Sequence, residues 1–169
     1  MPTTSRKCGA SMVIHPIPPV YNEHSRVLVL GSFPSVKSRE QGFFYGHPQN
    51  RFWKVLSMLG GCDVPKSIEE KRNLLLKMGI AVWDVIASCE IVGSSDSSIK
   101  NVQPNDLKSI LDNSSVTKIY VNGKTAKKYY DKYLLKSTGV EAVCLPSTSP
   151  ANAVYTLERL VAEWNVITE

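Results

Sequence analysis

One segment of the sequence concentrates side chains that could bind or transform a flat, polar ligand. It spans residues 31–53 and reads GSFPSVKSREQGFFYGHPQNRFW. An apolar run, VLVL, precedes it, and a helix-like run, FWKVLSMLG, closes it. The loop between the two runs has about 18 residues, which is unusually long, and such loops tend to be functional. The segment therefore predicts a site just past the end of a strand.

Three kinds of group in this segment could each make a different kind of contact with a ligand. Its aromatic side chains can stack on a flat ring, and its short polar side chains can bond to the edge of that ring. Turns rich in Ser, Gly and Pro place backbone N–H groups and hydroxyls against phosphates. An enzyme that acts on a base turned out of DNA needs these three elements together.

Other chemistries find less support in the motifs. The stretch GSFPS at 31–35 is neither G-x-G-x-x-G nor a phosphate-binding P-loop, because no second Gly and Lys follow at the required spacing. Gly123-Lys124-Thr125 matches only the tail of the P-loop motif. A serine hydrolase needs a base and an acid besides its nucleophile. His47 and several strand-end Ser residues leave a triad open, but there is no G-x-S-x-G elbow.

Length and composition indicate one globular domain with a mild basic excess. The chain has 169 residues, 43% hydrophobic and 21% charged, with a net charge of +5. Residues 1–12 are expected to be a disordered tail, and residues 13–169 a single domain. Six Lys against one Asp lie between Lys118 and Lys136. This cluster is either a solvated helix face or a surface that faces DNA.

The cysteines and the hydropathy bear on cofactors and compartment. Four Cys are present, with no C-x-x-C pair and no His at zinc spacing, so neither a metal nor any other cofactor is expected. Cys89 and Cys144 lie in apolar runs, which predicts buried thiols and a reducing compartment, the cytosol or a nucleus. No run is long enough to span a membrane, and the first residues lack the apolar core of a signal peptide.

Apolar runs alternate with helical patterns along the chain. The runs are apolar at nearly every position, which is typical of parallel strands covered on both faces. They lie at 26–32, 80–86, 117–123 and 141–147. The helical patterns lie at 51–59, 68–78, 106–111, 125–135 and 153–164. Ser67 and Asn152 are the expected N-caps of the second and the last of these helices.

This order predicts an α/β fold, a doubly wound parallel sheet with helices on both faces. In such a sheet, ligands bind beyond the carboxyl ends of the strands. That rule selects four polar segments: the loop after Gly31, the Ser-rich stretch that follows VWDVI, the turn at 122–124, and residues 145–152.

Two of these segments resemble the signatures of a known family. Residues 31–34 (GSFP) with 45–53 (YGHPQNRFW), and later 147–152 (STSPAN), are similar to the two signature segments of the uracil-DNA glycosylase superfamily. The likeness is greatest to its hypoxanthine-preferring, deoxyinosine glycosylase branch, which residues 79–98 also resemble. It runs from about Pro19 to the C-terminus. It implies a three-layer α/β/α sandwich around a short, mainly four-stranded parallel sheet.

The resemblance implies that Asn50 is the catalytic residue. In that branch, the matching Asn assists the attacking water during cleavage through an oxocarbenium-like state. A neutral amide can hold and polarise water without adding a charge beside the DNA phosphates. The alternative is that Asn50, directly before a helix, is only an N-cap.

Five further residues are implied to hold the flipped base: Gly31, Ser32, Phe33, Tyr45 and Asp84. Tyr45 would stack on the base, or else pack on the helix below it. Asp84 would read the Watson–Crick edge, as a carboxylate acceptor or, if protonated, as a donor; its alternative role is a cap or a salt bridge. Phe33 departs from the family, since many members carry a water-activating Asp or Asn there. That departure puts efficient uracil removal in doubt and fits the deoxyinosine branch.

The remaining matches are implied to contact DNA. In relatives, the second signature loop presses into the minor groove and pinches the backbone, although here it could also be a turn with an N-cap from Asn152. The residues are Pro34, Ser35, His47, Ser147, Thr148, Ser149, Pro150 and Asn152. Residues 94–97 belong to a pocket rim or a phosphate-binding turn, with no assigned role.

The sequence thus predicts a monofunctional DNA glycosylase of base excision repair, acting as a monomer on single- or double-stranded DNA. Hypoxanthine is the first candidate base, and uracil and xanthine follow it. No Lys within the signature segments is an evident Schiff-base nucleophile, which favours water. Two alternatives stay open: a non-catalytic module that binds damaged or mismatched DNA, and a hydrolase of small nucleosides.

Overall fold

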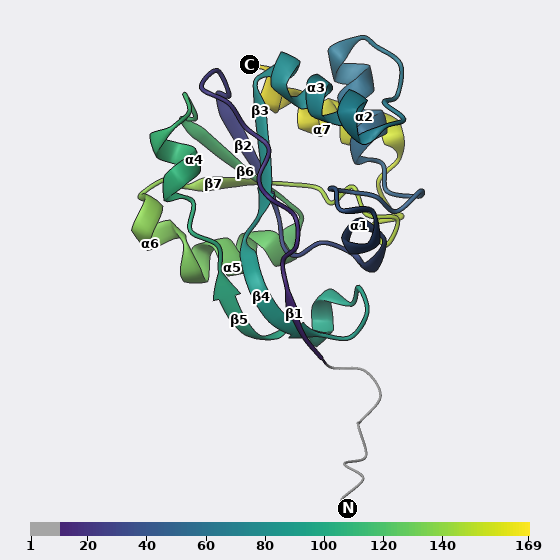
Figure 1. Ribbon diagram of the computed structural model, residues 1–169. Coiled ribbons are helices and arrows are strands. Elements are labelled where there is room, and N and C mark those ends of the chain that lie inside the picture. Colours follow the sequence, from purple (N-terminus) through teal and green to yellow (C-terminus); the bar gives the residue numbers. More distant parts are fainter. Residues whose placement is uncertain (1–10) are drawn as a thin grey trace, which may run out of the picture.

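A four-stranded parallel sheet forms the centre of the molecule (Figure 1). The computed structural model describes residues 11–169. The strands lie in the order β3-β2-β6-β7, and every neighbouring pair is parallel. They are β2 (Val27–Gly31), β3 (Ile80–Asp84), β6 (Lys118–Asn122) and β7 (Ala142–Leu145). All four coincide with the predicted apolar runs, and the predicted α/β class is confirmed.

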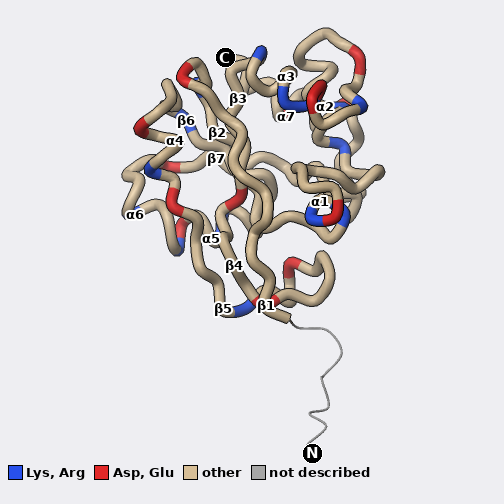
Figure 2. The backbone as a smooth tube through the Cα atoms, in the orientation of Figure 1, with Lys and Arg blue, Asp and Glu red and all other residues tan. Residues whose placement is uncertain are grey.

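The apolar character of these strands follows from cover on both faces. Successive side chains of β2 point to opposite sides. Val27 and Val29 join the core cluster under α2, α3 and α7, whereas Leu28 and Leu30 join the cluster on the α4 and α5 side. Charges are correspondingly sparse in the sheet: β2 and β7 carry none, and β3 carries only Asp84 (Figure 2).

Helices flank the sheet in two groups, with α2, α3 and α7 on one side and α4, α5 and α6 on the other (Figure 1). The helices are α1 (Val36–Gln41), α2 (Phe52–Gly60), α3 (Ile68–Met78), α4 (Lys108–Asp112), α5 (Lys124–Tyr133), α6 (Leu135–Thr138) and α7 (Leu157–Trp164), with 3-10 turns η1 (Asp96–Ser98) and η2 (Asn165–Thr168). No helix within residues 11–169 is long and apolar enough to cross a membrane.

The long loop after β2 is less irregular than its sequence indicates. It contains α1, whose N-cap Ser35 accepts a hydrogen bond from the Ser38 backbone N–H at 3.2 Å. Gly42 ends the helix in a left-handed conformation. Six residues are too few to show a helical period, which is why this element was not predicted.

The last helix begins later than predicted. It was expected from residue 153 with Asn152 as its N-cap, but α7 starts at Leu157, and Thr156 accepts from the Arg159 N–H at 3.2 Å. The Asn152 amide instead donates to the Ser147 carbonyl at 3.0 Å.

Arg51 explains this delay. Its guanidinium donates to the carbonyls of Ser149 and Asn152, each at 3.0 Å, and to the carbonyl of Tyr155. These bonds to a basic side chain hold residues 149–155 as a loop, in place of the helical turn that propensity favours. These hydrogen bonds join positions about a hundred residues apart, so no local sequence pattern could predict them.

A second, antiparallel sheet was not predicted. It has the order β1-β4-β5 and comprises β1 (Ser11–Ile14), β4 (Ile86–Ile91) and β5 (Lys100–Pro104). The predicted strand 80–86 ends at Asp84, and the segment after Ile86 was expected to be a loop; instead β4 buries Ile86, Cys89 and Ile91 and leaves the positions between them partly exposed. Such half-buried patterning is usual for antiparallel strands.

The N-terminal boundary and one thiol also differ from expectation. Ser11 and Met12, assigned to the tail, pair with Ile91 and Glu90 in the small sheet. The rest of the expected tail, residues 1–10, lies outside the described residues. Cys89 is buried as predicted, but Cys144 is exposed, because β7 is the edge strand of the parallel sheet.

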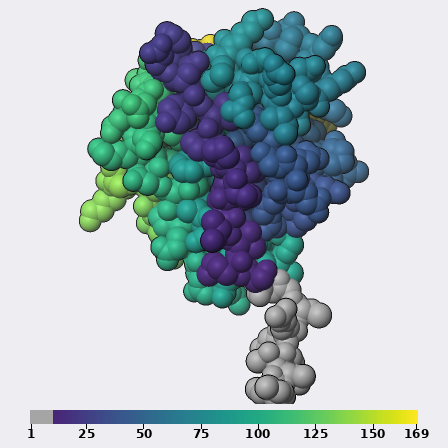
Figure 3. Space-filling view, in the orientation of Figure 1, coloured from purple at the N-terminus to yellow at the C-terminus, as the bar shows by residue number. Residues whose placement is uncertain are grey.

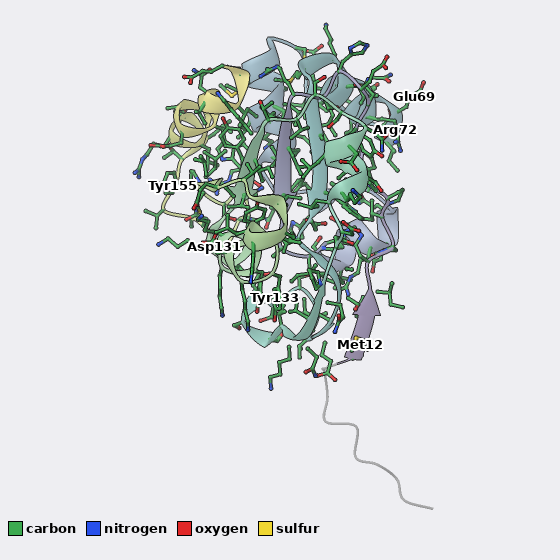
Figure 4. All side chains as sticks on the ribbon, turned by 90° about the vertical axis from the view of Figure 1, so that its left-hand side faces the viewer. Met12, Glu69, Arg72, Asp131, Tyr133 and Tyr155 are labelled. Carbon is green, nitrogen blue, oxygen red and sulfur yellow. The ribbon has the colours of Figure 1, made fainter. Side chains whose placement is uncertain are left out.

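Residues 11–20, which we call the N-terminal strap, cross one face of the molecule. Figure 3 shows this stretch in purple between the blue and the green parts of the surface. The His15 N–H donates to the Ala87 carbonyl at 2.7 Å, and Val20 pairs with Val82 in an antiparallel bridge. Figure 4 shows Met12, on β1, far from Arg72 of α3 at the other end of the molecule. The strap thus links the small sheet to the edge of the parallel sheet.

Candidate active site

A cavity of about 360 Å³ opens at the carboxyl ends of the parallel strands, where the fold predicts a ligand site. It is large enough for a nucleobase. Every residue assigned to the site from sequence lines it except Asn152. The loop segments 41–50 and 142–157, which contribute to its walls, contain no Lys, Arg, Asp or Glu. The acidic side chains that line the cavity, Asp84 and Asp96, therefore come from outside these two loops.

Asn50 faces this cavity with one end of its amide. Its Oδ1 accepts two hydrogen bonds, from the Phe52 backbone N–H at 2.9 Å and from the Thr148 hydroxyl at 2.9 Å. Both lone pairs of that oxygen are engaged, so the group left for a ligand is the Nδ2 donor. Asn50 can thus orient a water or a substrate oxygen, but it cannot take a proton from it. It also satisfies the N–H of Phe52, the first residue of α2, but the N-cap of that helix is Arg51 and not Asn50 as the alternative expected.

Thr148 connects Asn50 to a third strand end. The residue is fully buried. Its hydroxyl oxygen accepts from the Asn122 Nδ2 at 3.0 Å, and its backbone N–H donates to the Asn122 Oδ1 at 3.0 Å. The turn at 122–124 was among the four segments selected from sequence, but Asn122 itself was given no role in the site. We call Asn50, Thr148 and Asn122 the amide wall.

A buried ionisable pair lies elsewhere in the site. The His15 Nε2 is 2.7 Å from the Asp84 Oδ2, and the side chains are 3% and 5% exposed. His15 belongs to the N-terminal strap and was missed, because the stretch IHPIPP carries no motif and lies outside the signature segments. The partner of Asp84 is thus 69 residues away in sequence.

Gly31 allows Asp84 and Tyr45 to converge. A Cβ at position 31 would lie 2.4 Å from the Asp84 Oδ1 and 3.1 Å from the Tyr45 hydroxyl oxygen. The first distance is far inside van der Waals contact, so only glycine leaves room for the carboxylate. We call His15, Asp84 and Tyr45 the carboxylate wall; Asp84 and Tyr45 line the cavity, and His15 contacts Asp84 without lining it.

Tyr45 combines packing with an unused hydroxyl. Its ring stacks on Phe52, with centroids 4.0 Å apart and planes at 27°, and its φ is +52°. Its hydroxyl oxygen is buried and has no hydrogen-bond partner. Burial, and secondarily the charge of Asp84, raises the pKa of Tyr45 well above its usual range. The hydroxyl therefore stays protonated and available as a donor to a ligand.

Comparison with known proteins assigns the chain to a family. The sequence profile of the uracil DNA glycosylase superfamily matches residues 18–167. The chain belongs to this superfamily. Two proteins named hypoxanthine DNA glycosylase are similar to it. The one from Methanosarcina acetivorans is 32% identical over 92% of this chain and 98% of that protein, and the one from Methanosarcina barkeri is 34% identical over 80% and 85%.

A solved structure agrees with this assignment. The solution NMR structure of a candidate uracil DNA glycosylase from Methanosarcina acetivorans superposes with a TM-score of 0.76 at 29% identity, covering 93% of this chain and all of that one. The chain is thus a DNA glycosylase of the superfamily, and DNA with a damaged base is the substrate that membership implies. The resemblance seen in the sequence is confirmed.

In this glycosylase, Phe33 offers no polar atom to a water molecule. The side chain is 9% exposed and meets the His15 ring edge to face at 5.9 Å. The Arg39 guanidinium carbon lies 5.6 Å from the centre of the Phe33 ring on another side. Phe33 thus lines the cavity and packs against its neighbours.

A second carboxylate, Asp96, lines the cavity and had no role assigned from sequence. It accepts from the Ser32 hydroxyl at 3.2 Å, while Ser94 accepts from the Val36 N–H at 2.9 Å. Burial raises the pKa of Asp96, and the Ser32 hydrogen bond opposes that effect. Residues 94–96 thus belong to the rim and tie it to α1.

The second signature loop and His47 are ordered by local bonds. The Ser149 N–H donates to the Ser147 hydroxyl oxygen at 3.1 Å, and the Thr148 carbonyl accepts from the Arg51 N–H at 3.0 Å. The His47 Nδ1 accepts from the Gln49 N–H at 3.1 Å. Among residues 11–169, no three His, Cys, Asp or Glu side chains come together as a metal ion would require.

Proposed function

We propose that this DNA glycosylase removes hypoxanthine from DNA by hydrolysis of the N-glycosidic bond, with water as the nucleophile. The observation that carries the proposal is the pairing, in one cavity, of a neutral amide wall with a buried carboxylate. The names of the two similar Methanosarcina proteins support the choice of base.

The carboxylate wall is suited to hold the base. Hypoxanthine carries an N1–H donor beside a carbonyl. We propose that the Asp84 Oδ1 accepts that N–H, and that the unpartnered Tyr45 hydroxyl donates to a ring acceptor. The exposed part of the Tyr45 ring adds stacking, which is worth about 1–3 kcal/mol per base.

The amide wall is suited to place water near the sugar. As the glycosidic bond breaks, the base leaves with the bonding electrons and the sugar becomes oxocarbenium-like. The Asn50 Nδ2 would orient a water whose oxygen then bonds to the anomeric carbon. That oxygen keeps one proton as the new hydroxyl group and releases its other proton to solvent, and the departing base anion takes up one proton from solvent. No basic side chain is needed at Asn50, because the electrophile is already strong.

Water is preferred over an amine nucleophile. No Lys lines the cavity formed by residues 11–169. The cavity is built from a single chain, so we propose that the enzyme acts as a monomer, on double- or single-stranded DNA. Its compartment would be the one that holds DNA, the cytosol or a nucleus.

The test uses oligonucleotides with one deoxyinosine, deoxyuridine or deoxyxanthosine, single-stranded and in duplex, followed by alkaline cleavage. We expect cleavage at deoxyinosine first, with deoxyadenosine as the uncut control. If the folded protein at excess cuts none of them, the proposal fails; retained duplex binding would then indicate a binding module. Release from free nucleosides that is insensitive to salt would indicate the small-nucleoside alternative, because duplex binding weakens steeply with salt.

A further inference from the structure

His15 is held in place from both sides by the backbone of the strap. Before it, β1 pairs with β4, and the His15 N–H itself bonds to the Ala87 carbonyl at 2.7 Å. After it, Val20 bridges to Val82 on β3. The imidazole therefore enters the site from an anchored segment, and its position is fixed before any ligand binds.

The hydrogen bonds of the imidazole define its tautomer. The Ile17 backbone N–H donates to the His15 Nδ1 at 3.1 Å, so Nδ1 carries a lone pair and no hydrogen. The hydrogen of the neutral ring is then on Nε2, which donates to the Asp84 Oδ2 at 2.7 Å. This distance lies in the range of charge-assisted bonds to a carboxylate.

Aromatic rings prevent the imidazole from reorienting. Phe33, Phe44 and Trp83 surround it, with ring centroids at 5.9, 6.2 and 6.1 Å. Its side chain is 3% exposed. Little water reaches the ring, and a hydrogen on Nδ1 would displace the bond from the Ile17 N–H.

Three titratable groups act on Asp84, one from each element packed around it. His15 comes from the strap, Tyr45 from the loop before α2, and Asp96 from η1. In general, a second carboxylate nearby disfavours the charged form of a carboxyl group, whereas an N–H donated to it favours that form. His15 is thus the group that opposes protonation from within the protein.

We infer that His15 is a positioning residue that keeps Asp84 an ionised acceptor, so that the site selects bases with a ring N–H beside a carbonyl and rejects adenine. The inference rests on the proposed function and specifies its substrate class. It also decides between the two forms of Asp84 that the sequence left open.

The selectivity follows from hydrogen-bond polarity. Hypoxanthine, xanthine and guanine offer N1–H, and uracil and thymine offer N3–H, to a carboxylate that can only accept; this contact therefore excludes adenine, and other contacts must exclude guanine and thymine. Adenine offers a lone pair at N1, which would face the lone pairs of the Asp84 Oδ1. Adenine is the base whose deamination yields hypoxanthine, so an enzyme that removes hypoxanthine from DNA must leave it alone. A protonated Asp84 could donate to adenine N1 and would lose this discrimination.

The first experiment needs no catalysis. In the ¹⁵N-labelled full chain, the nitrogen shifts of His15 report its tautomer at neutral pH. We expect a protonated Nε2 and an unprotonated Nδ1; a protonated Nδ1 overturns the inference. The same sample is titrated with free hypoxanthine and free adenine, and hypoxanthine should bind about tenfold more tightly or better. Equal binding of the two bases also overturns it.

The second experiment measures the pH dependence of deoxyinosine excision in single turnovers. His15→Ala removes the N–H that is donated to the Asp84 carboxylate, so activity should begin to fall at a higher pH than in the wild type as the solution is acidified. His15→Gln, which can still donate, should keep the wild-type profile. A His15→Ala profile that is merely scaled down, with the same shape, would show a structural role only and overturn the inference.

A matched control comes from the other His–carboxylate contact of the described chain. His24 lies 3.3 Å from Glu23, with the two side chains 79% and 81% exposed. His24→Ala should leave both the profile and the base selectivity unchanged. If the wild-type protein excises nothing, the proposed function fails on its own. Two results then still decide on His15: its tautomer in the wild type, and the hypoxanthine-to-adenine binding ratio, which should fall in His15→Ala and stay at the wild-type value in His15→Gln; an unchanged ratio in His15→Ala overturns the inference.

Discussion

The two walls of the cavity differ in charge and in burial. The amide wall is neutral, and the acceptor oxygen of Asn50 is already saturated, so it offers donors only. The carboxylate wall holds a buried charge, and Asp84 itself is 3% exposed, whereas Asn50 is half-buried. A neutral wall can work beside DNA phosphates without repulsion, while a carboxylate can read a base only where it is shielded from them. The difference indicates a division of labour, with water placed by one wall and the base chosen by the other.

The largest effect should come from Asn50. Asn50→Ala removes the Nδ2 donor, and we expect single-turnover excision of deoxyinosine to fall by about 10²–10³-fold, as for the loss of one preorganised donor. It also removes the acceptor of the Phe52 N–H and the Thr148 hydroxyl, which costs about 1 kcal/mol of unfolding free energy. Rates are measured in single turnovers and stability by urea unfolding.

Asn50→Asp separates these two roles of Asn50. The carboxylate keeps an acceptor for the Phe52 N–H and the Thr148 hydroxyl, so stability should stay near that of wild type. It lacks the donor, so excision should remain low. Wild-type excision rates in Asn50→Asp would mean that Asn50 contributes only through the hydrogen bonds that its oxygen accepts. That result would contradict the placement of water by the amide wall.

A smaller effect is expected at Thr148, which holds the amide wall together. Thr148→Val keeps the shape but leaves the Asn50 Oδ1 and the Asn122 Nδ2 each short of a partner. Urea unfolding should show a loss of about 1–3 kcal/mol. Excision should fall about tenfold, because the Asn50 amide is less well oriented. Thr148→Ser keeps the hydroxyl and serves as the control; equal losses in the two variants would contradict a role for the hydrogen bonds.

The smallest effect should come from Tyr45 on the carboxylate wall. Its hydroxyl has no partner in the free protein, so Tyr45→Phe should leave the unfolding free energy unchanged or raise it by up to about 1 kcal/mol. Excision should fall severalfold if the hydroxyl donates to the base. Because the pKa of Tyr45 is raised, the ratio of wild-type to variant rates should stay constant across about pH 6–9. A clear loss of stability would mean that the hydroxyl already has a partner.

Local sequence patterns predicted most of the parallel sheet and most of the residues that line the cavity. The four strands read as apolar runs because both of their faces are covered, and helix α3 begins after Ser67, whose hydroxyl oxygen accepts from the Glu70 N–H at 3.0 Å. The position of the cavity was predicted from the rule that ligands bind beyond the carboxyl ends of parallel strands. Where long-range contacts override local preference, prediction failed: Arg51 delays α7, and the half-buried β4 was taken for a loop.

The amino-acid sequence alone therefore determined the sheet, the family and nearly all of the residues that line the site, because these depend on periodicity and on motifs contiguous in the chain. Tertiary structure alone decided how those residues are used. It saturates the oxygen of Asn50, adds Asn122, and brings His15 against Asp84. Hydrogen bonds between distant segments set which atoms remain free to meet a ligand, and no spacing in the sequence encodes that choice.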